Sequence, residues 1–196
     1  MNREKEIFKQ GSTTYYFSSI FFPRKIKADV FKLYSFVRVA DDYVVNIPAD
    51  RSEFKRLRKL WETSIADAHF ETTVSASDDV NTRVVKNMVS VSRKYRFEQK
   101  WVTSFLDSMQ ADLDKKKYTT LEDIIWYMYG SAEVIGLMMA KIMGLPKKAY
   151  PYARMQGRAM QYINFVRDIA EDNRLGRSYF PASELKKYGL ADLQTK

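Results

Sequence analysis

The 196-residue sequence contains no cysteine, a single histidine and few residues that favour turns. Without cysteine, the chain can form no disulfide, thiolate zinc site or iron–sulfur cluster, so we expect a reducing compartment and predict the cytoplasm. One histidine, His69, excludes a two-histidine zinc site, and metal chemistry must then use oxygen ligands. Only 7 Gly and 5 Pro are present, which is little turn chemistry for a sandwich or barrel. A mainly helical fold remains.

Long apolar runs are also missing. The longest one near the middle, residues 134 to 140, is far shorter than the roughly 20 residues that a spanning helix needs. No long apolar run follows the charged first residues, so we expect no secretory signal. The sequence therefore predicts neither a membrane-spanning helix nor export.

The charge of the chain is strongly positive. Lys and Arg number 33 against 24 Asp and Glu, which gives a net charge of +9. This excess suggests an anionic partner, such as nucleic acid, a membrane surface or a phosphorylated substrate. The cations are spread along the chain with acids between them, and this argues against nucleic acid, which favours a clustered basic patch.

Hydrophobic periodicity predicts an all-α bundle. The chain is 45% hydrophobic and of a length typical of one domain, so we expect a single domain over residues 1–196. Residues 75–78 and 119–122 supply capping side chains. A short helix or extended segment is expected over residues 12–22. Helices are predicted over residues 27–45, 50–68, 79–94, 98–115, 121–143, 146–173 and 182–188.

The first pattern with chemical content lies near the C-terminal end. In a helix, Gln161, Asn164, Asp168 and Asp172 fall within an arc of roughly 80°. Two carboxylates and an amide oxygen are ligands that Mg²⁺ prefers, and Mg²⁺ commonly binds substrate phosphates as well. The alternative is a solvated helix face whose acids pair with neighbouring arginines, although acids four residues apart repel one another.

A second acidic pattern lies in the first predicted helix. Asp41 comes four residues after Val37 and continues the stripe of Val30 and Tyr34, which we expect to face inward. A carboxylate on a core face is costly unless it is paired or bound to metal. A salt bridge from Arg38 to Asp41 or Asp42 is the alternative.

Several segments, in this order, resemble the squalene/phytoene synthase family. They are Ser12–Tyr16, Phe36–Asp42, Tyr127–Gly136, and Asn164–Asp172 continuing through Gly176–Pro181. The similarity spans nearly the whole chain, and ordered motifs are far more specific than one pair of acids.

The resemblance implies an isoprenoid-synthase-type helical bundle in which two acidic helices face each other across a cavity. It implies head-to-head condensation of two prenyl diphosphates through a cyclopropyl diphosphate. Phytoene from two geranylgeranyl diphosphates is the first choice, and squalene or dehydrosqualene from farnesyl diphosphate is the alternative. NADPH is needed only for squalene. A peripheral membrane contact is compatible with catalysis, since the product is an oil. A non-catalytic basic module that binds an anionic membrane or nucleic acid is the alternative from another class.

The resemblance also assigns roles to individual residues. Mg²⁺, with Mn²⁺ as the alternative, would be held by Asp41, Asp42, Asn164, Asp168 and Asp172. Arg38, Arg167 and Arg177 would bind the diphosphate or act as cations just outside the groups that contact it, and Tyr34 would lie near the reacting ends. The catalytic set is Tyr34, Arg38, Asp41, Asp168 and Asp172. Other substrate contacts are Ser12 and Tyr15 at a diphosphate, with Tyr127, Ile135, Gly136 and Gln161.

Small residues in the predicted helix 121–143 allow two interpretations. Gly130, Gly136 and Ala140, beside aromatic neighbours, would make room for a prenyl chain. Close packing against another helix is the alternative.

Two features depart from the family pattern. The family usually has an aspartate four residues after the first one, whereas this chain has Val45, with Asn46 following. Asp42 or Asn46 could supply the missing oxygen. Family members also continue through further helices, so we expect this chain to lack the C-terminal ones.

Overall fold

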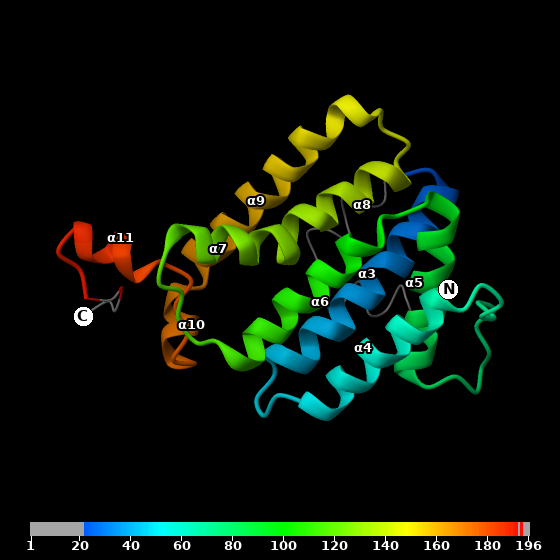
Figure 1. Ribbon diagram of the computed structural model, residues 1–196, viewed down its shortest axis with the longest axis horizontal. Helices are drawn as coiled ribbons and strands as arrows, with labels where there is room; N and C mark the ends of the chain where they lie inside the picture. Colours follow the sequence, from blue (N-terminus) through cyan, green and yellow to red (C-terminus); the bar gives the residue numbers. More distant parts are fainter. Residues whose placement is uncertain (1–21, 192, 194–196) are drawn as a thin grey trace. The chain divides into compact units, whose positions relative to one another are not determined.

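A computed structural model describes residues 22–191 and residue 193 (Figure 1). Ser12, Tyr15 and nearly all of the predicted segment 12–22 lie outside the described residues. The chain divides into two compact units. The first comprises the chain up to Glu98 together with Lys141–Gly144, and the second comprises Gln99–Ala140 together with the chain from Leu145 onward. The expected single domain stays a prediction.

The described residues confirm the all-α prediction. They contain helices and no named strand, and one isolated bridge joins Lys117 to Ser178. Over the same residues, no helix combines the length and apolar character needed to cross a bilayer.

The first unit is built from α3 (Arg24–Val45), α4 (Arg51–Ala66) and α5 (Val80–Tyr95), each of which packs against the other two. Its core is aromatic and aliphatic, and Phe36 of α3 meets Trp61 of α4 with ring centroids 5.8 Å apart. The Asp79 side chain caps α5 by accepting from the Thr82 N–H. The cap is therefore one residue beyond the predicted capping segment 75–78.

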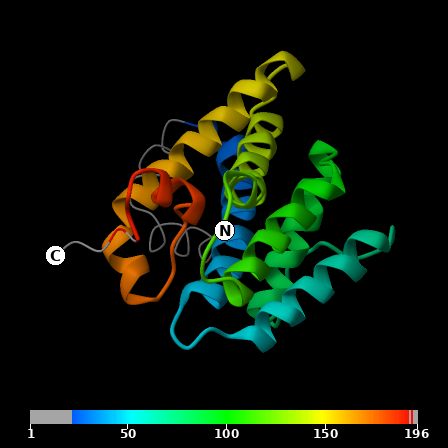
Figure 2. The same cartoon turned by 60° about the vertical axis from the view of Figure 1, so that its left-hand side comes forward.

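The second unit places two long helical segments side by side. Its elements are α6 (Gln99–Asp114), α7 (Leu121–Met128), the π-helical turn η2 (Tyr129–Glu133), most of α8 (Val134–Ile142), the 3₁₀ turn η3 (Lys147–Ala149), α9 (Tyr150–Arg167), α10 (Ile169–Arg174) and α11 (Ala182–Lys187). Both α6 and α9 pack against η2, and α9 runs alongside α7 and α8 (Figures 1 and 2).

Two predicted helices in this unit differ in detail. The segment 121–143 is helical as expected, but it passes through the π turn η2. It begins with a capping box formed by Thr120 and Asp123, one residue later than predicted. The segment 146–173 begins with a 3₁₀ turn and is interrupted at Asp168, whose φ and ψ of −98° and 9° leave the helical region.

Close helix packing accounts for the small residues of this segment. A Cβ on Gly130 would lie 2.1 Å from the Ser104 carbonyl oxygen of α6, and a Cβ on Gly136 would lie 2.3 Å from the Ala153 carbonyl oxygen of α9. At these two glycines the structure favours the alternative of close helix packing over room for a prenyl chain. Neighbouring backbone already occupies the space that a side chain would need.

Candidate functional site

The acidic segment of α3 is held by one arginine. The Arg38 guanidinium lies 3.3 Å from Asp41 Oδ2 and 2.5 Å from Asp42 Oδ1. Burial opposes the charge of Arg38, but the two carboxylates outweigh this effect and raise its pKa. The salt-bridge alternative is thus confirmed for both acids.

The inward orientation predicted for Asp41 is wrong. The deeply buried face of α3 carries Leu33, Phe36 and Ala40, whereas the Asp41 side chain is 36% exposed. Tyr34 and Val37, which precede Asp41 on its own stripe of the helix, are only partly buried. From Tyr34 to Asp41 the stripe therefore runs along the edge of the core, where a carboxylate keeps access to water.

Val45 is the last residue of α3 and is 37% exposed. The Asn46 N–H donates to the Asp42 carbonyl oxygen at 3.2 Å and ends the helix. A hydrogen-bonded network anchors this end, because the Tyr43 hydroxyl donates to Asn81 Oδ1 of α5 at 2.9 Å, and Asn81 Nδ2 donates to Glu53 Oε2 of α4 at 2.9 Å.

The second acidic segment keeps its predicted one-turn spacing despite the interruption at Asp168. The Asp168 N–H donates to the Asn164 carbonyl oxygen at 2.9 Å, and the Asp172 N–H donates to the Asp168 carbonyl oxygen at 2.8 Å. Gln161 lies one turn earlier, and its Oε1 accepts from Asn164 Nδ2 at 3.5 Å. The four polar residues therefore follow one another along α9 and α10, as predicted.

The two carboxylates of this segment differ in environment. Arg167, which is largely exposed, donates from Nε and Nη2 to the two oxygens of Asp168, each at 2.7 Å. Burial, together with the charges of Asp168 and Glu171, raises the pKa of Asp172 to about 6, although Arg177 opposes the shift. A nearby positive charge would relieve this repulsion.

A tight turn after α10 brings the chain at Arg177 back to Asp172. Gly176 has a φ of +67°, a left-handed conformation that glycine adopts without strain. The next N–H, that of Arg177, donates to the Asp172 carbonyl oxygen at 2.8 Å. Arg177 is 8% exposed, so a buried guanidinium accompanies the acidic pair within the second unit.

The donor set of this segment fits Mg²⁺. Asp168 and Asp172 offer carboxylate oxygens and Asn164 an amide oxygen, and Mg²⁺ completes its octahedral shell with waters and substrate phosphates. The described residues contain no group of three or more acidic, His or Cys side chains placed to hold a metal ion.

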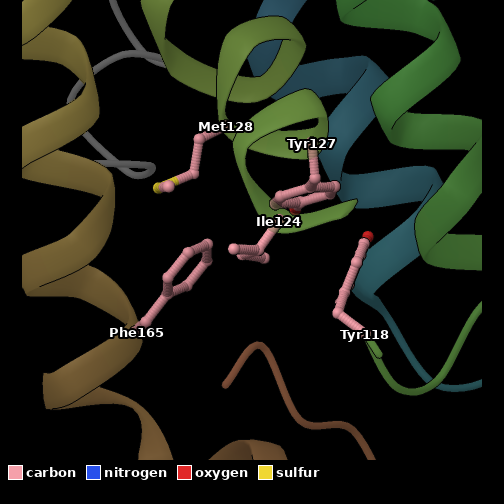
Figure 3. Packing of buried hydrophobic residues seen from close by; sticks show 5 residues of the cluster. All are labelled: Tyr118, Ile124, Tyr127, Met128 and Phe165. Carbon is pink, nitrogen blue, oxygen red and sulfur yellow. The ribbon is translucent and has the colours of Figure 1, made fainter. Parts of the chain in front are cut away.

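Tyr127, a predicted substrate contact, lies in the core of the second unit. It packs with Tyr118, Ile124, Met128 and Phe165 (Figure 3). Its hydroxyl donates to Asp112 Oδ2 at 2.8 Å, and burial raises its pKa well above the ordinary value. The ring is 3% exposed, and its role toward a substrate stays a prediction. Ile135, the other apolar contact, is partly buried.

Asp112 and Glu133 are two of the three buried acids that the sequence did not single out, the third being Asp29. Asp112 of α6 accepts from the hydroxyls of Tyr127 and Tyr179. Glu133 of η2 is fully buried, and its two oxygens accept from Arg154 Nε at 2.8 Å and Arg158 Nε at 2.6 Å. The available signal was a carboxylate on an otherwise apolar helix face.

The two acidic segments belong to different compact units. The segment on α3 contains two adjacent carboxylates and the segment on α9 and α10 contains two that lie one turn apart. Each has an arginine beside its carboxylates. Their predicted arrangement across one cavity stays a prediction. Carboxylates beside an arginine are groups suited to a divalent cation and an anionic ligand.

Comparison with known proteins establishes the family. The Squalene/phytoene synthase family model matches residues 8–195, so the chain belongs to this family. It is 28% identical to the 15-cis-phytoene synthase of Paracoccus sp. (strain N81106 / MBIC 01143), over 94% of this chain and 60% of that protein. It is 30% identical to the 15-cis-phytoene synthase of Pantoea ananas, over 97% of this chain and 62% of that protein. The chain thus spans about 60% of the length of these relatives.

Solved structures show the same fold. A dehydrosqualene synthase in complex with ligand superimposes with a TM-score of 0.77 at 26% identity, over 97% of this chain and 64% of that one. The squalene synthase HpnC from Alicyclobacillus acidocaldarius superimposes with a TM-score of 0.76 at 20% identity, over 96% of this chain and 68% of that one. The predicted isoprenoid-synthase-type bundle is therefore confirmed.

Proposed function

We propose that this protein catalyses the head-to-head condensation of two prenyl diphosphates. The observation that carries the proposal is the hydrogen-bonded spacing of Asn164, Asp168 and Asp172, with the buried Arg177 beside them. This arrangement supplies oxygen ligands and a cation on one segment, which suits a diphosphate bound through a divalent cation. The names of the family relatives support the same reaction class.

In this proposal Asp41, Asp42, Asn164, Asp168 and Asp172 hold Mg²⁺, or Mn²⁺ in its place. When bound, the metal neutralises the charge that develops on the departing diphosphate. The phosphates of the substrate would supply further oxygen ligands to the metal. The expected pairing of the two acidic segments across the substrate is part of the proposal.

The arginines have separate tasks. Arg38 holds Asp41 and Asp42 in the absence of a ligand, and we propose that it turns to the diphosphate when a metal takes over the carboxylates. Arg167, which pairs with Asp168, likewise turns from its carboxylate to the diphosphate. Arg177 stabilises the leaving group from a buried position, where its charge is screened less by solvent.

We propose geranylgeranyl diphosphate as the substrate and phytoene as the product, because two of the relatives are 15-cis-phytoene synthases at 28% and 30% identity. Farnesyl diphosphate is the second candidate. It is favoured by the 24% identical 4,4'-diapophytoene synthase of Staphylococcus haemolyticus (strain JCSC1435), matched over 95% of this chain and 64% of that protein. NADPH belongs to the proposal only if the product is squalene.

The test is incubation of the full-length protein with Mg²⁺ and either the C15 or the C20 diphosphate, with and without NADPH, followed by product identification. We expect a C40 hydrocarbon from the C20 substrate without NADPH, and loss of product with a chelator. Failure to form any head-to-head product would refute the proposed function. Binding of the inactive protein to anionic vesicles would then favour a non-catalytic basic module.

A peripheral membrane contact and a cytoplasmic location belong to the same proposal. The product is an oil that must leave the protein for a lipid phase, and the net charge of +9 attracts anionic headgroups. Flotation with vesicles containing anionic lipid, compared with neutral vesicles, tests the contact. Equal recovery with both vesicle types would contradict it.

A further inference from the structure

Asp112 is a buried carboxylate that no proposed step of the reaction uses. It lies on α6 and is 2% exposed. Its Oδ2 accepts from the Tyr127 hydroxyl and its Oδ1 accepts from the Tyr179 hydroxyl, each at 2.8 Å. Both oxygens thus bind tyrosines from different segments. A buried acid is costly unless hydrogen bonds satisfy it, so its benefit must lie in the arrangement that it holds.

One of these tyrosines connects Asp112 to the acidic segment. The Tyr179 ring stacks on Phe165 with centroids 4.6 Å apart and planes within 4°. Phe165 immediately follows Asn164 on α9, and Figure 3 shows its ring directed toward Tyr127 and Ile124. Tyr179 itself comes two residues after Arg177. The ring and the chain around it therefore contact the proposed ligand segment on both sides.

The chain around Tyr179 is tied to the loop between α6 and α7. The Ser178 N–H donates to the Lys116 carbonyl oxygen at 2.9 Å, and the Ala182 N–H donates to the Tyr118 carbonyl oxygen at 3.0 Å. These bonds fix the backbone on either side of Tyr179. The bond from Tyr179 to Asp112 is the side-chain anchor between them.

We propose that Asp112 is a positioning residue: by holding the Tyr179 hydroxyl, it fixes the segment that carries Arg177 against Asp172. This inference rests on the proposed function for its link to turnover, whereas the positioning itself concerns the protein without ligand. Loss of the anchor leaves the 177–180 segment held only by its backbone hydrogen bonds, so its distance from α10 fluctuates more. The Arg177–Asp172 hydrogen bond then opens more often, and the site must reorder when it binds diphosphate.

The same aromatic cluster offers a matched control. Tyr118 is 1% exposed, and its ring centroid lies 5.7 Å from that of Tyr179. Its buried hydroxyl has no hydrogen-bond partner among the described residues. Tyr118→Phe and Tyr179→Phe therefore remove the same atom from the same cluster, but only Tyr179→Phe breaks a bond to Asp112.

The first measurement is hydrogen exchange of the ligand-free, full-length protein. In Tyr179→Phe we expect the amides of Asp172 and Arg177 to exchange about tenfold faster than in wild type, the equivalent of one charge-assisted hydrogen bond. In Tyr118→Phe these amides should exchange at the wild-type rate. Asp112→Asn, which keeps the size of the side chain, should resemble Tyr179→Phe. Equal exchange in Tyr179→Phe and Tyr118→Phe would overturn the positioning role.

The second measurement is the Mg²⁺ concentration that gives half-maximal binding of inorganic diphosphate. We expect it to rise about five- to tenfold in Tyr179→Phe and to stay unchanged in Tyr118→Phe. A lower melting temperature in Tyr179→Phe with unchanged exchange and unchanged Mg²⁺ requirement would show that Asp112 only stabilises the core. If exchange changes as expected but the wild type forms no product, the proposed function fails and the positioning role stands.

Discussion

The backbone N–H of Arg177 donates to the carbonyl oxygen of Asp172 at 2.8 Å, across the turn that ends α10. This bond places a buried cation at the end of a segment whose two aspartates repel each other. Arg177 lowers the pKa of Asp172 but does not offset its burial and the charge of Asp168, which hold the pKa at about 6. The segment therefore keeps two carboxylates close together beside a buried cation.

The raised pKa of Asp172 predicts a pH-dependent stability without metal. The pKa rises from 3.8 to about 6 on folding, so the folded state binds more protons than the unfolded state between these values. The stability contributed by this group is present below about pH 4 and is lost as the pH rises through about 6. Because the side chain is half-exposed, we expect a change of about 1 kcal/mol or less. Urea melts of wild type and Asp172→Asn from pH 4 to 8 test this, and parallel curves would contradict it.

Removal of either aspartate of the second segment should abolish turnover. Asp168→Ala or Asp172→Ala deletes a proposed ligand but no core side chain, so we expect product formation to fall about 100-fold or more with near wild-type helicity. Glu171→Ala is the matched control, because Glu171 is an exposed acid between them on α10. Product assays and circular dichroism measure both effects. Wild-type turnover in either aspartate variant would favour a solvated helix face.

Val45→Asp should strengthen Mg²⁺ binding in the full-length protein. The new carboxylate would lie one turn beyond Asp41, within reach of a metal held there. Since Val45 is 37% exposed, the charge should change the free energy of unfolding by about 0.5 kcal/mol or less without ligand. Thermal melts with and without Mg²⁺ and diphosphate measure the gain. Val45→Thr controls for polarity, and a ligand-induced shift in Val45→Asp no larger than that in wild type would show that Asp42 or Asn46 already supplies the oxygen.

Glu133→Gln should destabilise the protein because it leaves two arginines facing an uncharged amide. Arg154 and Arg158 are partly exposed and can turn to water, so we expect a loss of about 1 to 3 kcal/mol, below that of a fully buried pair. Glu62→Gln, which breaks the exposed pair with Arg58, should cost about 0.5 kcal/mol or less. Urea unfolding of the two variants provides the comparison. Equal losses would show that burial of Glu133 adds nothing.

The helices were predictable because their signals are local. The apolar repeat of α3 and the absence of turn residues within α6 act over one or two turns of chain. The π turn at residues 129–133 was not predictable in the same way. There a Cβ on Gly130 would lie 2.1 Å from the Ser104 carbonyl oxygen of α6, and this is a contact with a residue distant in sequence.

The chain by itself determined the one-turn spacing of Asn164, Asp168 and Asp172, since helix geometry places residues four apart on one face. It also indicated the family, which the match of the family model to residues 8–195 confirms. Only the tertiary structure decided that Asp41 lies at the edge of the core and that Asp112 lies inside it. Burial depends on which helices pack against a face, and this is set by contacts between segments that the local sequence does not specify.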